Sequence, residues 1–229
     1  TYDKYKKSYT DALNRTIGKP KSVTDYDNAI AALETATAIF PKDTSLQNKL
    51  EKYRADRPVA LFSLDWIEAK GCIENWNWKE SDLNNHMGHD FQVTSTADVY
   101  GTKFENVAVL YTSDNGWYDR GKQMFFTYDV QDYKLFTGGS ALWEKAKSFS
   151  GYPALKVFGC RSDGVWEEIF TRGLQTISKP SSFSLDISKY QLLQIRYGTY
   201  TNDSYNELYA KSGYDGITGV ILYDCTLSK

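Results

Sequence analysis

The sequence predicts a mostly β protein, an antiparallel β-sandwich of jelly-roll-like type that follows a small α-helical segment. Three observations predict this fold. Apolar residues recur every three to four positions up to residue 57 and every second position from Pro58 onward. Beyond Pro58, short segments rich in Val, Ile, Phe and Tyr follow one another, separated by turn residues. No long helical pattern lies between them, which argues against a parallel α/β sheet. We therefore expect a helical domain over residues 1–57 and a sandwich over 58–229.

Three helices are expected in the first domain. The first covers residues 2–17, where aromatic and aliphatic residues form one stripe before a glycine and a proline. The second begins near residue 24 and ends before Pro41, which cannot continue a helix. Alanines along the second helix allow a neighbour to approach closely, and a short third helix over 43–53 is expected to pack against the pair.

Within this segment, residues 25–50, DYDNAIAALETATAIFPKDTSLQNKL, resemble a tetratricopeptide repeat. Alanine, aromatic and proline-aspartate signals follow in the order of a repeat's second helix and the start of the next repeat. Such stacks generally need about three repeats to be stable. The resemblance implies either that the first helix completes a hairpin leaning on the next domain, or that more repeats lie upstream. The alternative is a generic helical spacer that has no binding groove. If a groove is present, it is expected to bind a protein partner.

The second domain contains the expected strands. A hairpin is expected at residues 161–164, Arg-Ser-Asp-Gly, because Gly164 can supply the positive φ that such turns need. Residues 140–148 and 205–212 are interpreted as helical or turn insertions. The expected strands cover residues 106–112, 123–130, 133–136, 154–160, 165–171, 182–187, 191–197 and 217–226.

Charge and composition exclude several classes of partner. The net charge of −2 and the pI near 5.8 lack the cationic surplus that a phosphate backbone favours, so nucleic acid is not expected. No apolar run approaches the roughly 18 residues that cross a bilayer. The chain starts without Met, so an anchor or export signal is expected upstream. The three cysteines cannot all pair; we expect small buried hydrophobes, with a Cys160–Cys225 bridge left open.

Sets of residues that carry catalysis are sparse. His86 and His89 have a His-x-x-His spacing, but the neighbouring glycine and asparagines favour a surface loop over a metal site. The adjacent Glu167 and Glu168 should point to opposite faces of a strand, so they cannot both flank one glycosidic bond. Nucleophile-elbow and phosphate-binding glycine motifs are missing from the sequence. The sequence therefore predicts no enzyme, cofactor or metal.

Aromatic residues make up 15% of the chain, and several fall in segments that have the pattern of loops. Tyr200 and Tyr205 lie in one such loop. A loop ring beside Asp, Asn and Arg suits a sugar, because the apolar face of a pyranose can lie on the ring while polar neighbours bind its hydroxyls. The predicted ligand-binding residues are Asp114, Asn115, Trp117, Tyr118 and Arg120, together with Trp76 and Trp78.

These indoles also have structural interpretations. Trp117 could instead plug the end of the sandwich, and Trp76 and Trp78, two positions apart, could both belong to the core. Trp66, Trp143 and Trp166 are interpreted mainly as core residues.

A second resemblance covers most of residues 60–229. Four stretches, 97–112, 123–139, 153–171 and 182–198, together resemble the NPCBM/NEW2 family of carbohydrate-binding modules. Asp98, Gly101 and Phe104 stand in the order of the family's Asp–Gly–Tyr opening, with Phe in place of Tyr, and Asp163 with Gly164 match its hairpin. After the late strand the sequence is longer and more aromatic than the family pattern, and no ligand residue is carried over to it.

This resemblance implies a β-sandwich of bacterial surface or secreted proteins that binds galactose-type or other sugars. The helical segment would then be a stalk between an anchor and the displayed sandwich. We therefore expect a non-catalytic carbohydrate-binding module, extracellular or at the cell surface. The alternative is a structural or protein-protein interaction domain without sugar binding, whose helical part binds a protein partner.

Overall fold

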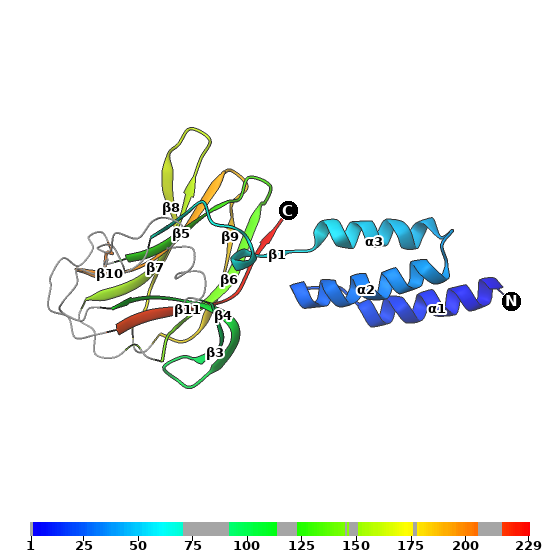
Figure 1. Ribbon diagram of the computed structural model, residues 1–229, viewed down its shortest axis with the longest axis horizontal. Helices are drawn as coiled ribbons and strands as arrows, with labels where there is room; N and C mark the ends of the chain where they lie inside the picture. Colours follow the sequence, from blue (N-terminus) through cyan, green and yellow to red (C-terminus); the bar gives the residue numbers. More distant parts are fainter. Residues whose placement is uncertain are drawn as a thin grey trace. The chain divides into compact units, whose positions relative to one another are not determined.

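The computed structural model describes residues 2–70, 92–113, 123–144, 146, 151–175, 178–205 and 217–229. The chain divides into two compact units. One contains Thr1–Ala60 with Ser228–Lys229, and the other contains Leu61–Leu227. Figure 1 shows the three helices in the first unit and most of the strands in the second.

The helical unit contains α1 (Tyr2–Ile17), α2 (Val23–Ile39) and α3 (Thr44–Asp56), which confirms the three expected helices. The second helix starts slightly earlier than expected. Ser22 caps it, because its hydroxyl accepts from the Asp25 backbone N–H while the Asp25 carboxylate accepts from the Ser22 N–H. Ala29 and Ala36 of α2 are fully buried, as their small size predicted. They belong to a core with Leu13, Ile17, Leu33, Phe40, Leu46 and Leu50.

The β unit is an antiparallel β-sandwich, as the period-two pattern predicted. The described strands are β1 (Val59–Ala60), β2 (Glu68–Lys70), β3 (Gln92–Ala97), β4 (Lys103–Ser113), β5 (Gln123–Asp129), β6 (Leu135–Leu142), β7 (Tyr152–Cys160), β8 (Trp166–Gly173), β9 (Ser181–Asp186), β10 (Leu192–Tyr200) and β11 (Ile217–Ser228). A single 3₁₀ turn, η1 (Leu61–Ser63), precedes β2.

The described strands form two sheets. One has the order β3-β4-β11-β6-β9, with β1 also paired to β11, and the other has the order β2-β5-β10-β7-β8 (Figure 1). Large side chains from both sheets fill the space between them, including Phe126, Tyr128, Phe136, Leu155 and Tyr197. Because each strand alternates its side chains, the intervening residues of the five-stranded sheet lie on its outer face.

The expected hairpin at residues 161–164 is confirmed. Gly164 has φ of +81°, and its N–H donates to the Arg161 carbonyl at 2.9 Å. The expected insertion at 140–148 is wrong in its first part, because residues 140–142 continue β6. Two small residues, Gly138 and Gly139, precede them in β6. The structure shows why they are small: the Tyr223 ring lies where a Gly139 Cβ would be, and Cys225 Sγ would stand 2.7 Å from a Gly138 Cβ.

Two cysteines fall within the described residues. Cys160 and Cys225 are both free and buried, which confirms the expectation of small buried hydrophobes and excludes the bridge between them. Cys72 lies outside the described residues. Among the helices that the structure describes, none combines the length and apolarity needed to cross a membrane.

Candidate functional site

The ligand-binding residues predicted from sequence lie outside the described residues. These are Asp114, Asn115, Trp117, Tyr118, Arg120, Trp76 and Trp78. His86 and His89 lie outside them too. Among the described residues, another group of polar and aromatic side chains lies on the outer face of the five-stranded sheet. We call Phe125, Lys156, Phe158, Glu168, Arg196 and Tyr200 the cation–aromatic cluster.

The sequence places these side chains together through strand alternation. On β10, Leu193, Ile195 and Tyr197 point into the core, so the residues between them face outward. In the pairing of β10 with its two neighbours, Arg196 stands opposite Phe125 of β5 and Lys156 of β7. One face therefore gathers side chains from three adjacent strands.

Arg196 lies at the centre of the cluster. Its guanidinium carbon is 4.5 Å from the centre of the Phe158 ring and 5.5 Å from that of Phe125. The Gln194 side-chain oxygen accepts hydrogen bonds from Nε at 3.2 Å and from Nη2 at 2.5 Å. Gln194 in turn donates to the Thr127 hydroxyl at 3.0 Å. Burial lowers the pKa of Arg196, although a guanidinium stays charged at any physiological pH.

Lys156 is the second cation of the cluster, and its ammonium nitrogen is 2.6 Å from Glu168 Oε2. The same nitrogen lies 5.0 Å from the centre of the Tyr200 ring. The Lys156 side chain is 8% exposed and that of Glu168 is 41% exposed, so the pair reaches from the sheet to solvent. Thr171 also donates its hydroxyl proton to Glu168.

The pKa values of the cluster follow these contacts. Partial burial acts to raise the pKa of Glu168, but hydrogen bonds from Lys156 and Thr171 outweigh it, so the pKa is lowered. Burial raises the pKa of Tyr200 to about 12, against the opposing effect of Arg196. At neutral pH the cluster therefore contains two cations, one carboxylate and a neutral phenol.

A shift in register between β7 and β8 brings Glu168 to this face. Val157 pairs with Phe170, whereas Phe158 pairs with Glu168, so Ile169 is an extra residue in β8. Glu167 points the other way, where it accepts from Lys189 at 3.0 Å and from the Tyr190 hydroxyl at 2.9 Å. The two adjacent glutamates have separate partners and do not face each other across a cleft.

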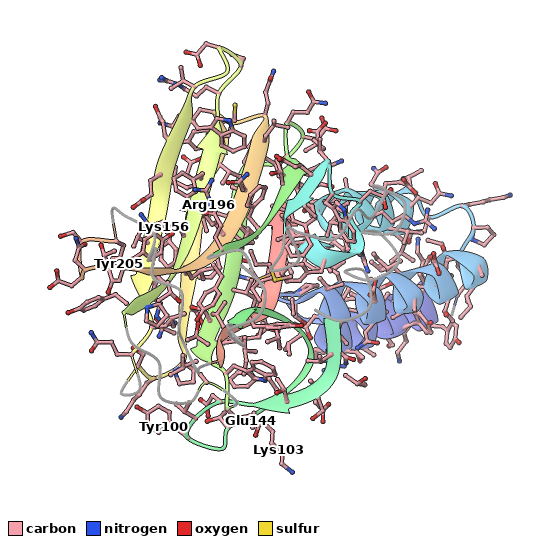
Figure 2. All side chains as sticks on the ribbon, turned by 60° about the vertical axis from the view of Figure 1, so that its left-hand side comes forward. Tyr100, Lys103, Glu144, Lys156, Arg196 and Tyr205 are labelled. Carbon is pink, nitrogen blue, oxygen red and sulfur yellow. The ribbon has the colours of Figure 1, made fainter. Side chains whose placement is uncertain are left out.

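Further rings lie around the cluster on the same face. Tyr152, opposite Tyr200 in the β7–β10 pair, is 36% exposed, and Trp166 is 42% exposed. The expectation that Trp166 belongs to the core is therefore wrong. The Tyr205 ring meets that of Tyr200 edge to face, with centroids 6.0 Å apart, and covers Gly173, where a Cβ would collide with its hydroxyl. Figure 2 shows Lys156, Arg196 and Tyr205 on one side of the β unit.

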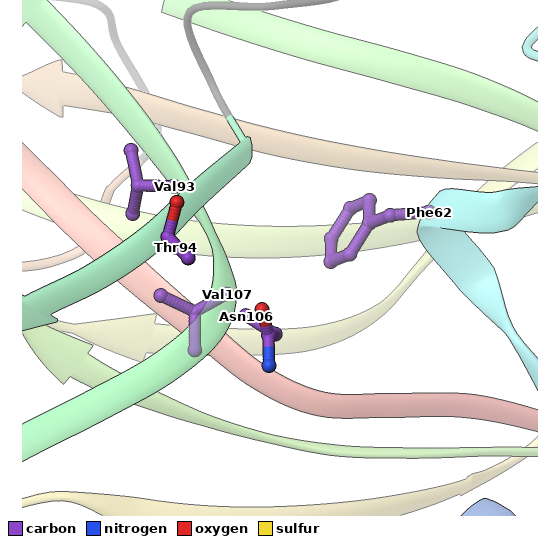
Figure 3. Close-up of a pocket in the computed structure, with 5 residues that line it drawn as sticks. All are labelled: Phe62, Val93, Thr94, Asn106 and Val107. Carbon is purple, nitrogen blue, oxygen red and sulfur yellow. The ribbon is translucent and has the colours of Figure 1, made fainter.

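A pocket of about 260 Å³ lies beside the edge strand β3. Figure 3 shows the Phe62 ring opposite Val93, Thr94, Asn106 and Val107. Asn106 has φ of +52°, which marks an irregular position in β4. With one amide and one hydroxyl among apolar side chains, this pocket has fewer polar groups than the cation–aromatic cluster.

The Asp98 motif forms a turn. The Asp98 side chain is buried, and its Oδ1 accepts from the backbone N–H groups of Tyr100 and Thr102 at 2.9 and 2.8 Å. Gly101 takes φ of +81° in this turn, and Phe104 packs against Tyr223. Across the part of the chain that the structure describes, no group of three or more His, Cys, Asp or Glu side chains could hold a metal ion.

Sequence reasoning did not single out Lys156 or Arg196. Each is the one charged residue of its strand, which is the ordinary pattern for an outward-facing position. Their meeting depends on strand pairing between segments forty residues apart in the chain, and the sequence pattern alone does not define that register.

No family model and no curated protein matches this chain. Solved structures do. The CBM51-2 and INT domains of Clostridium perfringens ZmpB are 12% identical with a TM-score of 0.43, over 76% of this chain and 32% of that one. The tandem CBM51 modules of Sp3GH98, a family 98 glycoside hydrolase of Streptococcus pneumoniae, are 14% identical with a TM-score of 0.45, over 75% and 46%. This chain thus spans less than half the length of these structures. The NPCBM/NEW2 and tetratricopeptide resemblances stay predictions.

Proposed function

We propose that the β unit is a non-catalytic carbohydrate-binding module with its site on the outer face of the five-stranded sheet. One observation carries the proposal: that face has the exposed rings of Tyr152 and Trp166. Beside them lie a half-buried Arg196 and an ion pair between the buried Lys156 and the exposed Glu168. The outer face of an antiparallel sheet is usually simply polar. Rings next to a few convergent polar groups are what a saccharide site requires.

Each part of the cluster has a chemical role in this proposal. Tyr152 and Trp166 offer ring surfaces on which the apolar face of a sugar can lie. Glu168 can accept hydrogen bonds from sugar hydroxyls, and Arg196 can donate them. The Lys156–Glu168 pair and the stacked rings hold these groups in place before a ligand arrives.

We propose that the loop residues predicted from sequence also bind the saccharide. Trp117 and Tyr118 would add ring surface, and the neighbouring Asp114, Asn115 and Arg120 would bind hydroxyls. Trp76 and Trp78 belong to the same proposal. The sugar would be galactose-type or another sugar, and the protein would act at the cell surface or outside the cell.

The test is binding of the full chain to a glycan array, followed by calorimetric titration. Tyr152→Ala and Trp166→Ala should each weaken binding by about 1 kcal/mol, the usual contribution of one stacking ring. Tyr5→Ala is the matched control, since Tyr5 of α1 is an exposed tyrosine of the helical unit (59%). Its removal should leave saccharide binding unchanged. If no saccharide binds at millimolar concentration, the carbohydrate function is wrong.

A second candidate function is protein interaction through the helical unit. Tyr2, Tyr5 and Ile39 are exposed, and the rings of Tyr2 and Tyr5 each lie 6.2 Å from that of Phe40. Exposed rings gathered in this way are typical of protein interfaces. A negative glycan array would favour this candidate.

A further inference from the structure

We infer that the ligand of the cation–aromatic cluster is a carboxylate-bearing saccharide, such as a uronic or sialic acid, and that its carboxylate binds Arg196. The inference rests on the proposed carbohydrate function and names the class of sugar. It starts from the hydrogen bonds and charges around the guanidinium.

Arg196 has hydrogen-bonding capacity left over. A guanidinium carries five N–H donors in one plane. Arg196 directs its Nε and one Nη2 donor to the single oxygen of Gln194. Among the residues that the structure describes, Nη1 has no acceptor. The two aromatic rings near the guanidinium carbon cannot accept these in-plane hydrogens as a carboxylate can.

The carboxylates of the face do not contact Arg196. Glu168 is bound to Lys156 and Thr171, and only its charge acts on Arg196. Glu68 of β2 likewise influences Arg196 through its charge alone. Half-buried charges are usually paired, so a guanidinium in this position is prepared for an anion from outside.

The register adds a second argument. Lys156 and Arg196 are directly opposite each other in the β7–β10 pair, and Figure 2 shows them on the same face. Like charges in directly opposite positions destabilise a sheet. Glu168 pairs with Lys156, and Glu68 acts on Arg196 only through its charge, so Arg196 is the cation of the pair without a carboxylate bound to it. A pair of like charges that lowers the stability of the sheet, and that lies within a polar cluster, indicates a role in ligand recognition.

The shape of the free group favours a carboxylate. The planar fork of a guanidinium matches the two oxygens of a carboxylate in a bidentate pair, and such bonds are shorter and stronger than those to a neutral hydroxyl. The hydroxyl groups of a neutral sugar would accept single hydrogen bonds and would not need the paired N–H groups of a guanidinium. Phe158, Tyr152 and Trp166 would still supply the ring surface for the rest of the saccharide.

The experiment compares pairs of saccharides that differ only in the carboxylate. The full chain is titrated with oligogalacturonate and its methyl ester, and with a sialylated glycan and the methyl ester of its sialic acid. We expect the acid of at least one pair to bind tenfold or more tightly than its neutral counterpart, with a preference that weakens as salt is added.

Variants assign the preference to Arg196. Arg196→Gln should remove the preference for the acid, and Arg196→Lys, which keeps the charge without the fork, should recover only part of it. Lys103→Gln is the control, because it removes an exposed cation of β4 in the other sheet. Circular dichroism confirms that each variant is folded before titration.

The outcomes separate this inference from the function on which it rests. If neutral saccharides bind and both members of every pair bind equally, the carboxylate assignment is overturned while the carbohydrate function stands. The assignment also fails if Arg196→Gln keeps the full preference, or if a sulfated analogue binds more tightly than the carboxylated one. If saccharides of every kind fail to bind, the proposed function itself is wrong.

Discussion

Replacing Glu168 by Gln should destabilise the β unit, because it leaves the Lys156 ammonium buried beside a neutral partner. Removing one member of a fully buried ion pair costs about 3–5 kcal/mol, whereas an exposed pair contributes about 0–1 kcal/mol. Here the lysine side chain is 8% exposed and the glutamate 41%, so solvent screens one side of the pair. We therefore expect a loss of about 1–2 kcal/mol in the free energy of unfolding. For a unit of this size, that lowers Tm by about 2–8 °C.

Urea unfolding followed by tryptophan fluorescence measures this loss. Lys156→Met is the matched control: it removes the buried charge and keeps the apolar stem, so it should be neutral or stabilising although it breaks the same ion pair. If both variants lose the same stability, the reasoning from burial is wrong.

The dependence on pH gives an independent check. The pKa of Glu168 is lower in the folded state than its ordinary value of about 4.3, so the unfolded state binds the proton first. The stability that Glu168 contributes is present above pH 4.3 and is lost as the pH falls through the folded pKa. The difference in free energy of unfolding between the wild type and Glu168→Gln should therefore become smaller as the pH falls from 5 toward 3.

Three further predictions follow from single contacts. Gly159→Ala should cost about 1–3 kcal/mol of stability, because the added Cβ would stand 2.5 Å from the Tyr190 ring; denaturant unfolding measures it. Trp117→Ala should weaken saccharide binding by about 1 kcal/mol with little change in unfolding, while a loss above about 3 kcal/mol of stability would identify a core residue. Burial raises the pKa of the Cys225 thiol, so this thiol should react with a thiol reagent far more slowly in the native protein than after unfolding. The absorbance of the released chromophore measures the reaction, and equal rates in the two states would contradict the burial of Cys225.

Much of the fold follows from local pattern, because periodicity depends on neighbouring residues. The strand expected at 191–197 became β10, and the hairpin at 161–164 formed where a glycine with positive φ was required. The continuation of β6 through residues 140–142 escaped prediction for the opposite reason. Gly139 looks like a turn residue in sequence, but it is small because Tyr223, more than eighty residues later, packs on it.

The candidate site was harder to predict than the fold. Loop aromatics such as Trp117 stand out by composition, and their role stays a prediction. Arg196 and Lys156 do not stand out, because a lone charge in a strand is the usual mark of an outward position. Only the pairing of β7 with β10 places the two cations opposite each other.

The extra residue Ile169 determines which side chains of β8 belong to the outer face. In a regular strand, Glu168 and Thr171 would point in opposite directions, since three positions separate them. With the extra residue, both stand on the side of Lys156, and Ile169 and Phe170 both turn to the core. Deleting Ile169 would exchange the two sides for everything before it, moving Trp166 and Glu168 toward the interior and Glu167 outward. One additional residue in β8 thus determines which side chains this strand contributes to the outer face of the sheet.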